Sequence, residues 1–274
     1  MKNNVNFING DFLNKDIYEK IKIYFNNKID VILSDMASNT SGNKELDAYR
    51  TGELCLNAMN LSKKLSKNLN ATLITSGYSR LLIDCNRPFA VPEAFIKKSE
   101  NTIIPGNLKL SKKEKKYRAK KFCIPYRNII SKIIKFRMKK NIIPIIVSLH
   151  SFTPIYKGSS RPWHLGLLYR REKRIFSLLD KELSKDKSIK IGINEPYKCN
   201  LKGDFSIPYF AESNGLPCIL LEIRQDLINT NTGVMKWSKK LSYLLNKVIF
   251  NHNIESSVRK PKDVLLYYKK RNVI

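Results

Sequence analysis

The feature that constrains this chain most is an apolar run that stops abruptly at a histidine. Residues 145–149 (IIVSL) have the length and composition of a buried strand, and His150 follows them with the hydroxyl-rich segment 151–154 (SFTP). Strands that are apolar on both faces are typical of parallel sheets covered by helices. Because ligands of such sheets bind beyond the carboxyl ends of the strands, we expect His150 to face a ligand site. Taken alone, a single histidine there is more often a structural side chain than a ligand.

A second run of this kind ends in a carboxylate. Residues 219–227 (ILLEIRQDL) are apolar up to Glu222 and then become charged. An imidazole and a carboxylate at the ends of two strands predict a shared crevice of the kind that water-activating metal sites need. The alternative is that Glu222 only pairs with Arg224, Arg80 or Arg87.

Length and composition limit the remaining possibilities. A chain of 274 residues can bury one sizeable core, or one core and a small appended unit. No stretch is long enough to cross a membrane and the N-terminal residues are polar, so a cytoplasmic protein is expected. The five cysteines lack CxxC spacing, which favours reduced thiols over disulfides or structural zinc.

The formal net charge of +28 has two explanations. Such a charge attracts RNA or anionic substrates. Because the basic residues are spread over the whole chain beside abundant Ile and Asn, the compositional drift of an AT-rich genome explains it better. The densest basic run, residues 112–121, predicts a solvated helix capped at Ser111.

Six blocks in the chain resemble the successive signatures of the N-formylglutamate amidohydrolase family. They are YSRLLIDCNRP (78–88), IPGN (104–107), HSFTP (150–154), RPWHLGLLY (161–169), GINEPY (192–197) and GLPCILLEIRQDLI (215–228). The resemblance implies a domain at 62–274 with an α/β fold, a three-layer mixed sheet flanked by helices as in zinc carboxypeptidases.

The resemblance also implies an activity and its residues. His150 would be a zinc ligand, and Glu222 the general base that later returns its proton to the leaving amine. The substrate would be N-formyl-L-glutamate or another small N-acyl amino acid. Its contacts would come from Asn86, Arg87, Arg80, Arg161, Arg224 and His164.

The zinc ligands implied by the resemblance are incomplete in this sequence. Two positions that usually hold histidine in the family are Arg127 and Phe210 here, and the family's first histidine and acidic ligand precede the region of resemblance. Asp35 or Asp47 are candidate replacements, although Asp47 is also a plausible helix cap. An impaired hydrolase and an inactive fusion protein therefore both remain open.

The first sixty residues resemble a different family. The segments GDF (10–12) and 30–59 are similar to the S-adenosylmethionine site of FtsJ-type ribosomal RNA 2'-O-methyltransferases. The resemblance implies a Rossmann-like fragment at 1–61, with Asp11 at the adenine of S-adenosylmethionine and Asp35 in the catalytic set. Local capping explains both aspartates equally well. The family's Gly-rich turn and its remaining catalytic residues cannot be placed, so a working methyltransferase is not expected.

The junction between the two regions falls in a predicted helix, residues 53–69, without a Pro/Gly/Ser-rich linker. One sheet that contains strands of both regions is therefore expected. The spacing further predicts helices at 175–183 and 235–251, a strand at 189–193, and a loosely attached basic tail at 256–274.

Overall fold

The computed structural model describes residues 31–35, 44–100, 102–251, 254 and 263–269. Its central element is a six-stranded sheet in the order β2-β1-β5-β10-β8-β9. The strands pair in parallel except for β10 with β8, so the sheet is mixed. The strands are β1 Val31–Asp35, β2 Leu73–Thr75, β5 Ile146–Phe152, β8 Leu165–Leu168, β9 Ile191–Ile193 and β10 Cys218–Arg224.

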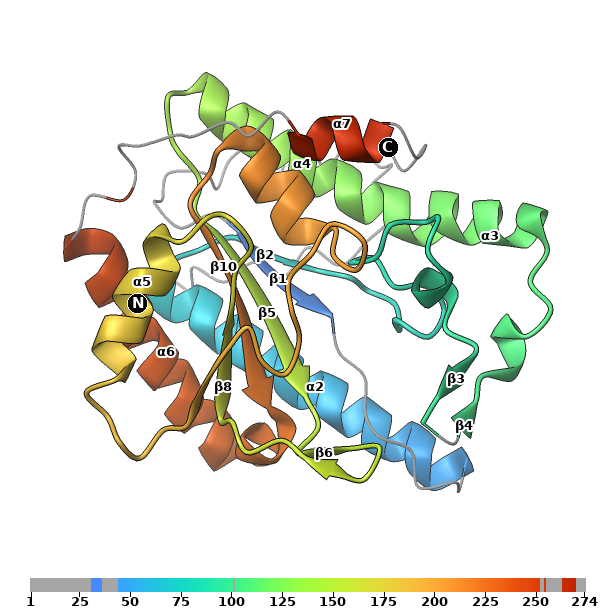
Figure 1. Cartoon of the computed structure of the whole chain (residues 1–274), viewed down its shortest axis with the longest axis horizontal. Coiled ribbons are helices and arrows are strands. Elements are labelled where there is room, and N and C mark those ends of the chain that lie inside the picture. The colour runs from blue at the N-terminus through green and yellow to red at the C-terminus, as the bar shows by residue number, and fades with distance from the viewer. Residues whose placement is uncertain (1–30, 36–43, 101, 252–253, 255–262, 270–274) are drawn as a thin grey trace.

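Helices cover the sheet on both sides, which gives the three layers seen in Figure 1. One side is covered by α2 (Lys44–Leu69), α5 (Arg174–Leu183) and α6 (Asn231–Asn251). Their buried side chains form one core with Val147 and Leu149 of β5. The predicted α/β fold with a mixed sheet between helices is confirmed, and the helices expected at 53–69, 175–183 and 235–251 are present with earlier starts.

The other side of the sheet is covered by α4 (Ile124–Lys139), the π-helical turn η4 (Ser206–Ala211) and α7 (Asp263–Lys269). The prediction of a loosely attached tail is wrong for 263–269, because Val264 and Tyr268 are fully buried in this core. The two residues are four positions apart, so both lie on one face of the short helix.

Shorter elements form the edges of the molecule. Two hairpins pair β3 (Lys98–Ser99) with β4 (Thr102–Ile103) and β6 (Ile155–Tyr156) with β7 (Ser159–Ser160). The remaining helical segments are α3 Lys112–Arg118, η1 Pro92–Phe95, η2 Pro105–Asn107, η3 Ala119–Cys123, η5 Glu212–Asn214 and η6 Gln225–Ile228. Ser111 caps α3 as predicted, since its side chain accepts a hydrogen bond from the Glu114 amide.

Strand β1 comes from the N-terminal region and lies inside the sheet. It pairs with β2 on one side and with β5 on the other. The junction predicted at 61/62 falls within α2, so the chain passes from one region to the other along a single helix. No helix in the described part of the chain is long and apolar enough to cross a membrane.

Candidate active site

His150 and Glu222 lie side by side on the sheet. They are register partners on the parallel strands β5 and β10. Leu149 and Leu221 contribute to the core under α2 and α6, so His150 and Glu222 point to the opposite face, beside Ser148 and Leu220. Both side chains are at least nine-tenths buried. The expected meeting of an imidazole and a carboxylate on one face is therefore present, although β5 continues past His150 to Phe152 instead of ending there.

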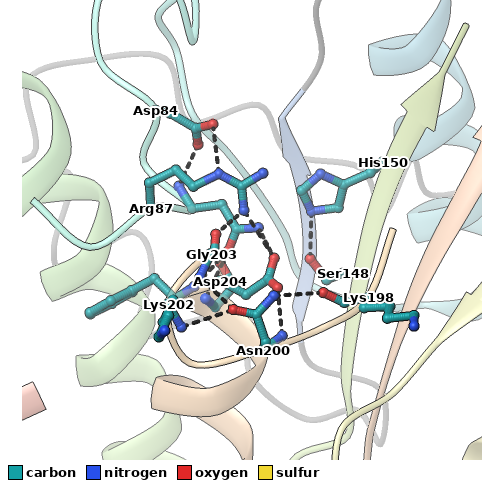
Figure 2. Close-up of polar contacts among 12 residues, drawn as sticks. Asp84, Arg87, Ser148, His150, Lys198, Asn200, Lys202, Gly203 and Asp204 are labelled. Carbon is teal, nitrogen blue, oxygen red and sulfur yellow. Dashed lines mark hydrogen bonds and ion pairs between the residues drawn. The ribbon is translucent and has the colours of Figure 1, made fainter. Parts of the chain in front are cut away.

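The His150 ring is oriented by its own strand. Its Nε2 atom lies 2.9 Å from the hydroxyl of Ser148, two residues earlier on the same face (Figure 2). Ser148 is fully buried, so this contact is shielded from water. One ring nitrogen is thus engaged within β5.

Glu222 carries a strongly perturbed carboxyl group on this face. Its Oε2 atom is enclosed and accepts no hydrogen bond from the described residues. The pKa of Glu222 is raised from 4.5 to about 8: burial is the largest cause and Asp204 acts in the same direction, while Arg80, Arg87 and Arg161 partly oppose them. A carboxyl group with this pKa is mostly protonated at neutral pH. It can gain and lose a proton at pH values near neutrality.

Two aspartates hold the arginines that surround Glu222. Asp84 accepts from Arg80 at 2.5 Å and lies 3.6 Å from the Nε of Arg87. On its other side Arg87 contacts Asp204 at 3.2 Å and donates to the carbonyl of Gly203 (Figure 2). The guanidinium of Arg87 is therefore fixed between two carboxylates.

Asn86 has a structural position. Its Oδ1 accepts from the backbone amides of Ser206 at 2.8 Å and Phe205 at 3.3 Å, and its Nδ2 lies 3.4 Å from Asp204. The side chain ties the 84–87 turn, which carries Arg87, to the start of η4.

Arg161 approaches Glu222 from a different segment, together with Tyr197. Arg161 donates to the Tyr197 hydroxyl at 3.0 Å, and its guanidinium lies 4.9 Å from the centre of the Tyr197 ring. Burial and the Glu222 carboxylate raise the pKa of Tyr197. These contacts bring Tyr197 into the site.

Two register-paired glycines make room for that turn. A Cβ on Gly166 would overlap the carbonyl oxygen of Glu195, and a Cβ on Gly192 would lie 2.8 Å from the Cβ of Glu195 and 2.9 Å from the Trp163 ring. The GLL and GIN segments of the signature blocks therefore let the 194–197 turn pack directly onto β8 and β9.

Arg224 and His164 both make contacts within the protein. Arg224 forms a bidentate pair with Asp226, at 2.7 and 3.0 Å, and donates to the carbonyls of Arg161, Pro162 and Trp163. The Nδ1 of His164 accepts from the Lys190 amide at 3.1 Å, and burial and Arg224 lower the pKa of this histidine. Both side chains stabilise the 161–164 loop, which positions Arg161.

Arg127 and Phe210 are also structural. Arg127 donates to the carbonyls of Cys85 and Arg87, and its guanidinium stacks 3.5 Å from the centre of the Phe205 ring. Phe210 is buried in the same core. Arg127 is thus hydrogen-bonded to the backbone on both sides of Asn86.

The described side chains do not form a zinc site by themselves. A catalytic zinc generally needs three protein ligands and a water. On this face His150 and Glu222 supply one imidazole and one carboxylate, and no group of three suitable side chains occurs in the described part of the chain. At the level of the backbone, Asp35 is the register partner of His150 on β1. Asp11, and the side chains of Asp35 and Asp47, lie outside what the structure describes.

A buried imidazole and a buried carboxyl group on neighbouring strands, with three arginines acting electrostatically on the carboxyl group, give this α/β fold a hydrolase-type site. The chain belongs to the N-formylglutamate amidohydrolase family, whose model matches residues 59–229. The model of the FtsJ-like methyltransferases matches residues 1–79, so both resemblances seen in the sequence are confirmed.

Solved structures share the fold of this chain. A gene product of Agrobacterium tumefaciens, Atu2144, superposes with a TM-score of 0.71 at 26% identity, over 81% of this chain and 90% of that one. The N-formylglutamate amidohydrolase of Ralstonia eutropha JMP134 shares the fold, with a TM-score of 0.54 at 18% identity over 82% of this chain and 95% of that one.

The curated relatives are ribosomal RNA methyltransferases. The ribosomal RNA large subunit methyltransferase E of Pelagibacter ubique is 53% identical over 58 residues, which are 21% of this chain and 29% of that protein. The protein of the same name from Cupriavidus taiwanensis is 35% identical over 116 residues, 37% of this chain and 52% of that protein. The chain thus spans about half the length of these relatives or less.

Proposed function

We propose that this chain hydrolyses the acyl amide of a small N-acyl amino acid, with N-formyl-L-glutamate as the first substrate to test. The observation that carries the proposal is Glu222, a buried carboxyl group beside His150 and within the field of three arginines; one of its oxygens accepts no hydrogen bond from the described residues. Membership of the amidohydrolase family supports the choice of an amide.

The arginines are suited to an anionic substrate. Arg80, Arg87 and Arg161 each carry a planar group that can bind a carboxylate through two parallel hydrogen bonds, which lysine cannot imitate. Asp84 and Asp204 hold the first two in place before the substrate arrives. A preorganised site of this kind orients the substrate without first ordering its own side chains.

Glu222 would transfer the proton in the reaction. The ionised carboxylate takes a proton from water as the water oxygen bonds to the acyl carbon. The same proton then passes from Glu222 to the amine nitrogen as the C–N bond breaks. With formylglutamate the products are formate and glutamate, and Glu222 returns to its ionised form.

The proposal is tested by following the release of free amine from N-formyl-L-glutamate, N-acetyl-L-glutamate and an uncharged N-formyl amino acid amide. Glu222→Gln is isosteric and is expected to lower turnover at least 100-fold, the usual contribution of a general base. Glu93→Gln, a change at an exposed glutamate of η1, serves as the matched control and should be neutral.

Arg161→Lys is expected to raise KM for the charged substrates about tenfold and to leave the uncharged amide unaffected, because one bidentate contact is lost. Thermal unfolding of each variant excludes misfolding as the cause. Release of amine at the same rate by wild type and Glu222→Gln would remove Glu222 from the mechanism, and no release from any N-acyl amino acid would overturn the proposal.

A further inference from the structure

The longest helical segment outside the active site has a strongly basic outer surface. α3, η3 and α4 follow one another without a break from Lys112 to Lys139, and α3 lies at one extremity of the molecule (Figure 1). Four lysines of its first part are exposed and form no ion pair within the described part of the chain: Lys112, Lys113, Lys116 and Lys120.

The local acidic residue does not neutralise these lysines. Glu114, the one acidic residue in 112–140, accepts from Arg118 at 2.9 Å. Arg118 in turn anchors the helix to the body of the protein, through the carbonyls of Leu82 and Gly106 and the side chain of Asn107. The carboxylate of Glu114 is therefore engaged by Arg118, and the charges of the four exposed lysines remain on the surface.

Aromatic rings lie against the same basic segment. Tyr78 and Tyr117, both about half exposed, contact Phe122 with ring centres 4.5 and 6.3 Å away. The Nζ of Lys121 donates to the Tyr117 hydroxyl at 3.0 Å and lies 5.9 Å from the centre of the Phe122 ring. Tyr78 is 39 residues before Tyr117, so the fold assembles a cluster that the sequence alone shows only as a lysine-rich helix.

Exposed rings interleaved with lysines match the chemistry of a single-stranded nucleic acid. Ammonium groups bind the phosphates, and aromatic faces stack on bases without regard to sequence. A surface that bound only simple anions would have no use for the half-exposed tyrosines. We propose that Tyr78, Tyr117 and Phe122, with Lys112, Lys113, Lys116, Lys120 and Lys121, form a basic-aromatic face that binds single-stranded nucleic acid.

The test uses fluorescence anisotropy with the full chain, a labelled 12-mer of oligo(U) or oligo(dT), and inorganic polyphosphate as competitor, over a series of salt concentrations. A charge variant replaces Lys112, Lys113, Lys116 and Lys120 by Gln. A ring variant combines Tyr78→Leu and Tyr117→Leu, which keep an apolar contact with Phe122 and remove the stacking faces. Matched controls on α6, across the sheet, are Lys236→Gln with Lys239→Gln, and Tyr243→Leu, all at exposed positions.

The charge variant is expected to bind the oligonucleotides at least tenfold more weakly, with a salt slope smaller by up to about 3 because about 0.7 counterions are released per phosphate contact. The ring variant should lose at least fivefold for the oligonucleotides and bind polyphosphate as wild type does. The α6 controls should match wild type. Equal losses in the α6 controls, an unaffected charge variant, or a ring variant that still binds the oligonucleotides like wild type would each overturn the proposal.

Discussion

Replacing Glu222 by glutamine is expected to stabilise the protein at alkaline pH, although it removes a group from the active site. The folded protein raises the pKa of Glu222 from 4.5 to about 8, mainly through burial. Between these values the folded state holds the proton more tightly than the unfolded state does. The free energy of unfolding contributed by this group is therefore fully present below pH 4.5 and is lost as the pH rises through 8.

The size of the effect follows from the pKa shift. Each unit of pKa difference corresponds to 1.36 kcal/mol, so ionising Glu222 in the folded protein costs roughly 2 kcal/mol of stability between pH 6 and pH 8. Glutamine does not titrate. Urea unfolding of wild type and Glu222→Gln at pH 6, 7 and 8 should show the variant gaining this amount relative to wild type over the series.

Glu212 provides the control for this experiment. It is as deeply buried as Glu222, but its carboxylate pairs with Arg170 and accepts from the backbone amides of Arg171 and Glu172. Glu212→Gln should therefore lower stability by roughly 1.5–3 kcal/mol at each pH, the usual value for hydrogen bonds to a charged group. Stability curves of wild type and Glu222→Gln that run parallel with pH would refute the argument that burial raises the pKa of Glu222.

Four further predictions follow from the same structure. The kcat/KM for amide hydrolysis should rise almost tenfold per pH unit up to about pH 8, because only ionised Glu222 accepts the proton; a flat profile between pH 6 and 8 would contradict this. Gly166→Ala should lower stability by about 1–3 kcal/mol in thermal unfolding, because its methyl group would overlap a backbone carbonyl, whereas Gly106→Ala has open space and should be neutral. If the ligands within the described part of the chain are the whole set, the purified protein should retain less than one zinc per chain after dialysis; stoichiometric zinc that disappears in His150→Ala would show that further residues complete the site. Leu33→Pro should lower stability by about 3 kcal/mol or more, since it removes a backbone donor from an interior strand; an unchanged urea midpoint would show that β1 is not part of the cooperative fold.

The position of His150 and Glu222 on one face of two neighbouring strands was predictable, because it follows from local patterns. Each residue ends an apolar run of strand length, and in a covered parallel sheet such runs lie next to one another. Which side of the strand each residue faces follows from the two-residue period, since Leu149 and Leu221 must point into a core. The structure adds the register between the two strands, which no local pattern contains.

The contacts of the polar residues were not predictable in this way. Asn86 has its partners about 120 residues away, at 204–206, and Arg224 has carbonyl partners about 60 residues away, at 161–163. A side chain with several donors takes whichever acceptors the fold brings near. Its sequence neighbours therefore identify the family but do not show whether it faces the substrate or holds a loop.

The short helix α7 was missed for a related reason. Val264 and Tyr268 have the four-residue spacing of a buried helix face, but two apolar positions in a basic segment give a weak signal. Tertiary contacts stabilise this helix: the Tyr268 ring packs on Phe205, and its hydroxyl donates to the Asp204 carbonyl at 2.6 Å. The end of the chain thereby supports the aspartate that holds Arg87.

Strand β1 links the two regions of the chain. Its residues lie within the match to the methyltransferase model, yet it pairs with β2 on one side and on the other with β5, the strand that carries His150. A strand inside a sheet satisfies two rows of backbone donors and acceptors, and its removal would leave β5 with an open edge. The five residues 31–35 are therefore part of the sheet that holds the candidate active site. Their last position, Asp35, is next to His150 in register, so this region contributes to the surroundings of the site whether or not it binds a cofactor.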